Sequence, residues 1–146
     1  MTDQTASPPK DALSQTLGLQ RVVLMDAEAG RAVLEYMAGI HMCHSGGVVQ
    51  GGFITGWLDA AMAHAVIATT GFDVTPMSLE LKVSFFAPVG PGLVTAEGWI
   101  ERRGKSTCFG EARLLNAAGE VLAKCSSTMR LISRAKVEAR TRDNQA

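Results

Sequence analysis

One carboxylate, Asp59, lies within the longest apolar run of the 146-residue chain, which extends from Phe53 to Ala68. Removing an ionised carboxylate from water costs on the order of several kcal/mol unless the group is paired or hydrogen-bonded. If the run is a helix, Thr55 and Ala63 lie one turn to either side of Asp59 on the same face. This spacing allows a small pocket with a polar edge around the carboxylate.

The run begins directly after two glycines, Gly51 and Gly52. Backbone N–H groups at the positive end of a helix dipole, with no side chains in front of them, can polarise a carbonyl group. A carboxylate farther along the helix could then activate water or attack the carbonyl carbon itself. The residues leave a structural alternative open, in which the glycines allow a tight turn and Asp59 makes a structural hydrogen bond or contacts another subunit.

The surrounding pattern predicts how these residues are held. The segment from Gly52 to Thr70 is too long and too rich in Ala, Met and Leu for a strand, and the glycine of TTGF predicts its end. Because this helix is apolar nearly all round, we expect it to be buried on most faces. Strands are predicted for the β-branched or alternating runs 20–25, 31–37, 77–86, 93–101, 106–115 and 121–132.

Short turns between consecutive strands predict an antiparallel sheet. The chain should therefore be an α+β domain whose curved sheet wraps one long buried helix, with Trp57 and Trp99 in the core between them. In the strand over 77–86 the apolar side chains alternate with polar ones, so one face should be buried. We expect a flexible arm over 1–18, a single domain over 19–133 and a solvated tail over 134–146.

Composition excludes several classes of function. Fourteen basic residues balance fourteen acidic ones, so no overall field favours nucleic acid or an anionic membrane. The apolar run is shorter than the roughly 20 residues of a membrane span. Three cysteines, Cys43, Cys108 and Cys125, are widely spaced, as in a cytoplasmic protein with reduced thiols. We expect them to be small core residues.

Other groups of residues give weaker indications of a functional site. The sequence HMCH lacks a second ligand pair at zinc-like spacing, so no metal site and no cofactor are predicted. His64, on the predicted helix, should be a hydrogen-bonded core or interface residue. Arg103 and Lys105 lie in a basic turn, where they could bind phosphate groups or simply face solvent.

The stretch from His44 to Asp59 resembles the hotdog-fold acyl-CoA thioesterases of the phenylacetyl-CoA thioesterase type. That pattern has an Asn or Gln, a glycine three residues on, a His-Gly-Gly, and an acidic residue nine positions after that His. Gly47, Gly51, Gly52 and Asp59 match in register. The likeness continues through SLELKVSFFAPV, RRGKS and NAAGEVLAKCSSTMRLI and covers roughly 22–132. It implies the same helix wrapped by an antiparallel sheet.

Carried over to this chain, the resemblance makes Asp59 the general base or nucleophile and the Gly51 N–H the donor to the thioester oxygen. Ser78 falls where relatives have a hydroxyl that holds the attacking water. Two positions depart from the pattern, because Gln50 replaces the usual His and His44 replaces the usual amide. Gln50 cannot carry a proton, but a thiolate whose pKa is about 8.5 departs without much protonation.

The expected function is hydrolysis of an acyl-CoA or related thioester to acid and thiol, with coenzyme A entering only as part of the substrate. Gly47, Gly52 and Thr55 would line the substrate site. The resemblance also implies a homodimer, or a tetramer of dimers, whose site spans two subunits. Two alternatives remain: a module that binds the thioester without cleaving it, and a hotdog lyase acting on enoyl or hydroxyacyl thioesters.

Overall fold

The computed structural model describes residues 11–145. Three helices, eight strands and one 3-10 turn follow one another in that part of the chain. In order they are α1 (Ala12–Leu17), β1 (Leu19–Asp26), β2 (Arg31–Ala38), η1 (Ile40–Met42), β3 (Cys43–His44), β4 (Val48–Val49), α2 (Gly51–Thr70), β5 (Val74–Phe85), β6 (Gly92–Arg103), β7 (Thr107–Leu115), β8 (Val121–Ser133) and α3 (Arg134–Gln145).

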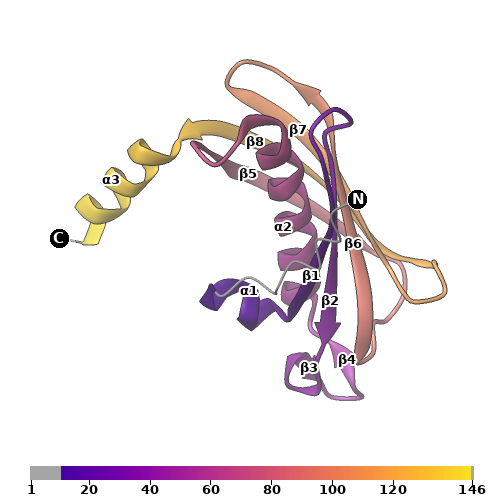
Figure 1. Ribbon diagram of the computed structural model, residues 1–146. Coiled ribbons are helices and arrows are strands. Elements are labelled where there is room, and N and C mark those ends of the chain that lie inside the picture. The colour runs from indigo at the N-terminus through magenta and orange to yellow at the C-terminus, as the bar shows by residue number, and fades with distance from the viewer. Residues whose placement is uncertain (1–10, 146) are drawn as a thin grey trace.

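Six strands form one antiparallel sheet in the order β1-β2-β6-β7-β8-β5. The sheet curves, and α2 lies along its concave face (Figure 1). β3 and β4 pair separately as a small ribbon beside the start of α2. All six strands predicted from the sequence are present in the sheet, and the predicted helix is α2. The α+β architecture of a long helix wrapped by a curved antiparallel sheet is confirmed.

The helix α2 is enclosed on the sides that meet the sheet. Seven of its residues are buried: Ile54, Trp57, Leu58, Ala61, Met62, Ala65 and Val66. Gly98 of β6 faces this helix so closely that a Cβ atom there would fall against the backbone of Ala61 and Met62. The missing side chain therefore sets how near the sheet comes to α2.

The two tryptophans differ in position. Trp57 is fully buried, stacks on Tyr36 with ring centroids 5.7 Å apart, and donates a hydrogen bond to the Leu17 carbonyl at 2.7 Å. Trp99 was wrongly assigned to the core. Side chains alternate along a strand, and because Gly98 faces α2, its neighbour must face the other way. Trp99 donates to the Glu101 carboxylate at 2.6 Å on the outer face.

The strand β5 is at one edge of the sheet, paired only with β8. Its predicted buried face is largely exposed in the single chain, and within residues 11–145 no further strand lies beyond this edge. Leu79 is 62% exposed and Phe85 is 52% exposed. An edge strand with exposed apolar side chains is a surface that a second chain can pair with and cover.

Both ends of the described chain are helical. Residues 12–17 of the predicted arm form α1, capped by the Asp11 side chain, which accepts from Ser14 N at 2.8 Å. The rest of that predicted arm, 1–10, lies outside the described residues. The predicted tail is α3, which has no buried residue and extends away from the end of β8 (Figure 1). The division into arm, domain and tail stays a prediction.

Candidate active site

The start of α2 presents a backbone donor. Gln50 caps the helix, because its Oε1 atom accepts a hydrogen bond from Gly52 N at 2.8 Å. The Gln50 backbone N–H donates to the Met42 carbonyl at 2.9 Å, which fixes how the chain enters the helix. Within residues 11–145, no acceptor faces the N–H of Gly51, the first residue of the helix. This N–H is available to a ligand at the positive end of the dipole.

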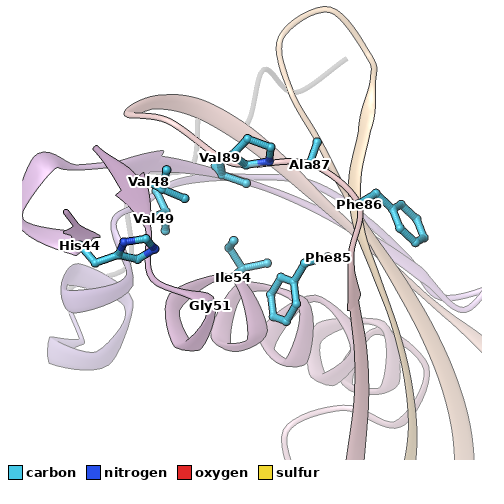
Figure 2. Close-up of a pocket in the computed structure, with 10 residues that line it drawn as sticks. His44, Val48, Val49, Gly51, Ile54, Phe85, Phe86, Ala87 and Val89 are labelled. Carbon is cyan, nitrogen blue, oxygen red and sulfur yellow. The ribbon is translucent and has the colours of Figure 1, made fainter. Parts of the chain in front are cut away.

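That donor opens into a cavity of about 390 Å³. Ten residues line it: His44, Val48, Val49, Gly51, Ile54, Phe85, Phe86, Ala87, Pro88 and Val89. Figure 2 shows His44 on one side of this space and Phe85 on the other, with Gly51 between them. The walls are mostly apolar, so a carbonyl group bound here would meet few competing polar groups.

Phe85 limits the space for a side chain at position 51. A Cβ atom at Gly51 would lie 3.1 Å from the Cζ atom of the Phe85 ring, which is tighter than ordinary packing. His44 is on the β3 side of the cavity and its Nδ1 atom is 3.0 Å from its neighbour's carbonyl, Ser45 O. Because a carbonyl only accepts, Nδ1 carries the proton in this contact and Nε2 is left for another partner.

The carboxylate lies elsewhere on the same helix. Ser78 of β5 donates a hydrogen bond to Asp59 Oδ1 at 2.6 Å, and Asp59 is half-buried. A bulge between Ser78 and Glu80 interrupts the pairing of β5 at this point and alters the direction of the strand. Thr55 does not reach the carboxylate through its hydroxyl, which donates to the Gly51 carbonyl at 2.8 Å. Asp59 and Ser78 therefore form a pair whose second carboxylate oxygen can accept from a ligand.

A single chain does not bring the donor and the carboxylate together. Asp59 follows Gly51 by eight residues, which is about 12 Å along a helix and about 80° around it. Asp59 is not among the residues that line the cavity beside Gly51. One carbonyl group cannot contact both residues of the same chain.

The remaining predicted residues are spread over the fold. Gly47 is in the turn between β3 and β4 with φ of +73°, a conformation that favours glycine. Gly52 is exposed at the helix start. Arg103 is the last residue of β6 and Lys105 is in the turn that follows it. The twelve residues of β6 span about 35 Å from the cavity end of the sheet. Within one chain they do not line the cavity.

Sequence reasoning missed the aromatic wall. Phe85 and Phe86 end β5 and begin the loop that closes the cavity, and Figure 2 shows Phe85 turned toward the helix and Phe86 turned away from it. The adjacent pair of phenylalanines before a proline was the available signal. His64 is hydrogen-bonded as predicted, because its Nδ1 atom lies 2.7 Å from the Ala60 carbonyl, but it is half-buried and not part of the core.

Two further findings concern residues 11–145. The histidines and the cysteine of HMCH do not gather with any other His, Cys, Asp or Glu into a group of three that could hold a metal ion. No helix in this part of the chain has both the length and the hydropathy that crossing a membrane requires. Cys108 and Cys125 are buried, as predicted, whereas Cys43 is half-buried.

Comparison with known proteins identifies the family to which this chain belongs. The family model of the thioesterase superfamily matches residues 46–123, which include the start of α2, Asp59 and Ser78. A relative from Saccharolobus solfataricus, named Putative esterase SSO2140, is 30% identical over 119 residues, or 82% of this chain and 84% of the relative. The chain belongs to the thioesterase superfamily and has its hotdog fold.

Two solved structures are similar to the whole fold. A phenylacetic acid degradation-related protein from Ralstonia eutropha JMP134 has a TM-score of 0.78 and 30% identity, over 86% of this chain and 93% of its own. The protein smu.793 from Streptococcus mutans UA159, solved with acetyl-CoA bound, has a TM-score of 0.70 and 17% identity, over 77% of this chain and 87% of its own. The resemblance to the phenylacetyl-CoA thioesterase type is thereby confirmed at the level of family and fold.

Proposed function

We propose that this protein hydrolyses an acyl-CoA, or a related acyl thioester, to the free acid and the thiol. The observation that carries the proposal is the combination of an unpaired Gly51 N–H beside an apolar cavity with a half-buried Asp59 held by Ser78. The first group can polarise a carbonyl and the second can activate water. Family membership supports this class of reaction, and the acetyl-CoA bound to the Streptococcus mutans protein supports the class of substrate.

In the proposed reaction the thioester oxygen accepts from Gly51 N–H. Asp59 takes a proton from water as the water oxygen bonds to the carbonyl carbon, and the carbon–sulfur bond then breaks. The electron pair leaves with sulfur, and the proton passes from Asp59 to the thiolate or to solvent. Ser78 holds Asp59 Oδ1, so Oδ2 faces the water. Attack by Asp59 itself, followed by hydrolysis of an anhydride, uses the same contacts.

Gln50 and His44 have supporting roles in this proposal. The Gln50 side chain is engaged in capping Gly52, so it holds the helix start and leaves Gly51 N–H free. It transfers no proton, and the thiolate leaves unprotonated. His44, on the cavity wall, can donate a hydrogen bond to the substrate from its ring. The rival function is binding of the thioester without cleavage, because Gln50 replaces an ionisable residue.

The active unit in this proposal is a homodimer. The 12 Å that separate Gly51 from Asp59 within a chain are overcome if the edge strand β5 pairs antiparallel with its copy, about a two-fold axis near the middle of the strand. Phe85, which lines the cavity beside Gly51, then lies alongside the first half of the partner strand, the half that contains the partner subunit's Ser78. Each dimer has two sites, and the exposed apolar residues of β5 are covered. A tetramer would combine two such dimers.

The acyl group has an apolar space available beyond the Asp59–Ser78 pair. A second cavity of about 680 Å³ lies two residues before Ser78 along β5, where Val74 and Pro76 contribute to its wall. Ile67 and His64 of α2 contribute the opposite wall. We infer that an acyl group passing the partner subunit's Asp59 enters this cavity, whose mainly apolar lining also includes Asp11, His64 and Arg134.

The first experiment measures free-thiol release from a panel of aliphatic and aromatic acyl-CoAs by the wild type and by Asp59→Asn. The asparagine keeps the shape and removes the charge, so turnover should fall by about a hundredfold or more. Activity in the mutant equal to that of the wild type would show that Asp59 is not the base. Binding without turnover in the wild type would instead favour the binding module.

A matched pair of variants tests the backbone donor. Proline is well accepted at the first position of a helix, and Gln50 has φ of −65° and ψ of 135°, which suits a residue before proline. Gly51→Pro therefore removes the N–H and also adds side-chain atoms near Phe85. Gly51→Ala adds a side-chain carbon and keeps the N–H. We expect Gly51→Pro to lower kcat by about a hundredfold more than Gly51→Ala does. Equal loss in both would assign the effect to crowding.

Mixed subunits test whether the site spans the dimer. A chain carrying Asp59→Asn and a chain carrying Gly51→Pro are each inactive alone, but a mixed dimer has one intact site if the site is shared. After random exchange, about a quarter of the wild-type activity should return, because half of the dimers are mixed and each has one intact site of two. If each chain held a complete site, no activity would return.

The cytoplasm is the proposed location. The three cysteines within residues 11–145 form no disulfide, which agrees with a reducing compartment.

A further inference from the structure

The helix α1 and its cap form one wall of the second cavity, the one that the proposed function assigns to the acyl group. Asp11, Leu13 and Ser14 line the cavity on this side, and His64 and Ile67 of α2 line it across from them. The model of the thioesterase superfamily matches residues 46–123, so α1 lies outside the matched part of the chain. This wall is therefore a feature to be explained from the chain's own contacts.

The cavity extends between the two edges of the sheet. β1 and β5 are the edge strands, and the sheet between them curves around α2 (Figure 1). Val74 and Pro76 contribute to the cavity from β5, whereas Val22 and Met25 contribute from β1. An acyl group that enters beside β5, past the partner subunit's Asp59, would cross α2 and end against β1 and α1.

The C-terminal end of α1 is fixed to the rest of the fold. The Leu17 carbonyl accepts a hydrogen bond from Trp57 Nε1 at 2.7 Å, and the Gly18 carbonyl accepts from Met37 N at 2.8 Å. Gly18 has φ of +78°, and a Cβ atom there would lie 2.5 Å from the Met37 carbonyl oxygen, so glycine suits both conditions. These contacts hold α1 in place beside the cavity.

The first turn of α1 lies at the cavity without packing into the core. No residue of α1 is buried, and Leu13 is 68% exposed although it lines the cavity. Removing such an apolar side chain from water is favourable, and an apolar ligand in the cavity could do so. Leu13 is therefore available for contact with the end of an acyl chain.

The polar groups of the cavity already have partners. The Asp11 carboxylate accepts from a backbone N–H of its own helix at 2.8 Å. His64 Nδ1 is 2.7 Å from the Ala60 carbonyl, and Arg134 Nε is 3.1 Å from the Glu138 carboxylate. Most of the other side chains that line the cavity are apolar. The end of an acyl group would therefore meet a mainly apolar surface.

We propose that α1 closes the far end of the acyl cavity and that Leu13 limits the length of the acyl chain. The inference rests on the proposed function and makes an extended apolar acyl group its substrate. An engineered cavity of about 150 Å³ is large enough for benzene, whereas this cavity is about 680 Å³. A single aromatic ring would leave most of the space empty, so a chain that reaches Leu13 fits it better.

The test measures the binding of coenzyme A thioethers, in which a sulfide replaces the thioester so that hydrolysis cannot occur. Isothermal titration of the full-length protein with straight alkyl chains, from butyl to dodecyl, gives the affinity as a function of chain length. For the wild type, each methylene that becomes buried should tighten binding about fourfold, until the chain reaches α1.

Two tryptophan variants of α1 separate a length limit from a disturbance of the helix. Leu13→Trp fills the end of the cavity, so the rise should stop at a shorter chain and the dodecyl probe should bind about tenfold more weakly. Ala12→Trp adds the same side chain at a neighbouring position that does not line the cavity, so each affinity should change by less than about twofold. Both positions are exposed, so neither substitution should unfold the chain. The butyl probe should bind all three proteins equally.

The outcomes separate this inference from the proposed function. Equal loss of dodecyl binding in both variants, or no loss in either, would overturn the role of Leu13 even if thioesters are hydrolysed. An affinity of the wild type that does not depend on chain length would overturn it as well. A length limit that shifts only in Leu13→Trp, without thiol release from any acyl-CoA, would support the role of α1 while refuting hydrolysis.

Discussion

The contact between Gly98 and α2 predicts a large effect from one added methyl group. A Cβ atom at Gly98 would lie 2.6 Å from Met62 N and against the Ala61 carbonyl, whereas ordinary contacts begin near 3.4 Å. The obstructing atoms are backbone in the middle of the central helix, so they cannot rotate away. In Gly98→Ala, either β6 or α2 must move by about 1 Å to relieve the nearest of these contacts.

The expected loss in the free energy of unfolding follows from the range for overpacked cores, about 1–3 kcal/mol. Because no flexible side chain can yield here, we expect the upper end, about 3 kcal/mol. For a chain of this length that corresponds to a fall in Tm of about 6–12 °C. The movement should also reach Asp59, which precedes Ala61 by two residues, and a displacement of about 1 Å can lower turnover about a hundredfold.

The measurement is urea unfolding at one fixed protein concentration, because the stability of the proposed dimer would depend on concentration. Two other Gly→Ala variants calibrate it. At Gly110 the added Cβ would lie 2.7 Å from the flexible end of Met129, so a smaller loss is expected. At Gly90 nothing lies within 4 Å, so little change is expected. If Gly98→Ala were no less stable than Gly90→Ala, the close approach of sheet and helix would be wrong.

The remaining predictions concern buried groups. Trp57→Phe removes the donor to the Leu17 carbonyl and should cost about 2–3 kcal/mol, measured by chemical unfolding. In the native protein a thiol-alkylating reagent should label Cys43 first and reach Cys108 and Cys125 only on unfolding, as peptide mass mapping would show. Burial, followed by the nearby Asp59 charge, raises the pKa of Cys125 to about 11 from 9.0. That thiol's stabilising contribution is full below pH 9 and is lost as the pH rises to 11, by at most about 3 kcal/mol, a loss that should be absent in Cys125→Ala.

Local patterns in the sequence were enough to predict the six strands of the large sheet and the helix α2, but not α1, α3, β3 or β4. Period-two alternation identified six strands, and the long apolar run identified α2, because side-chain periodicity follows directly from backbone geometry. The same local patterns selected Gly51 and Asp59. A carboxylate in an apolar helix that follows two glycines is unusual, and this can be recognised without any knowledge of the fold. The family resemblance then suggested Ser78.

Relations between distant residues required the tertiary structure. Alternation separates the two faces of a strand but does not say which face is buried, and Trp99 was misplaced because the close approach of α2 at Gly98 decides that choice. The Asp59–Ser78 hydrogen bond joins a helix to the edge strand.

The distribution of charge was equally invisible in the sequence. The composition is balanced overall, and Arg130 and Arg140 line one cavity only because α3 follows the end of β8. The sequence by itself determined which groups can do chemistry and which elements carry them. Only the folded chain decided which of those groups meet, because contacts between distant segments depend on how the sheet curves around the helix.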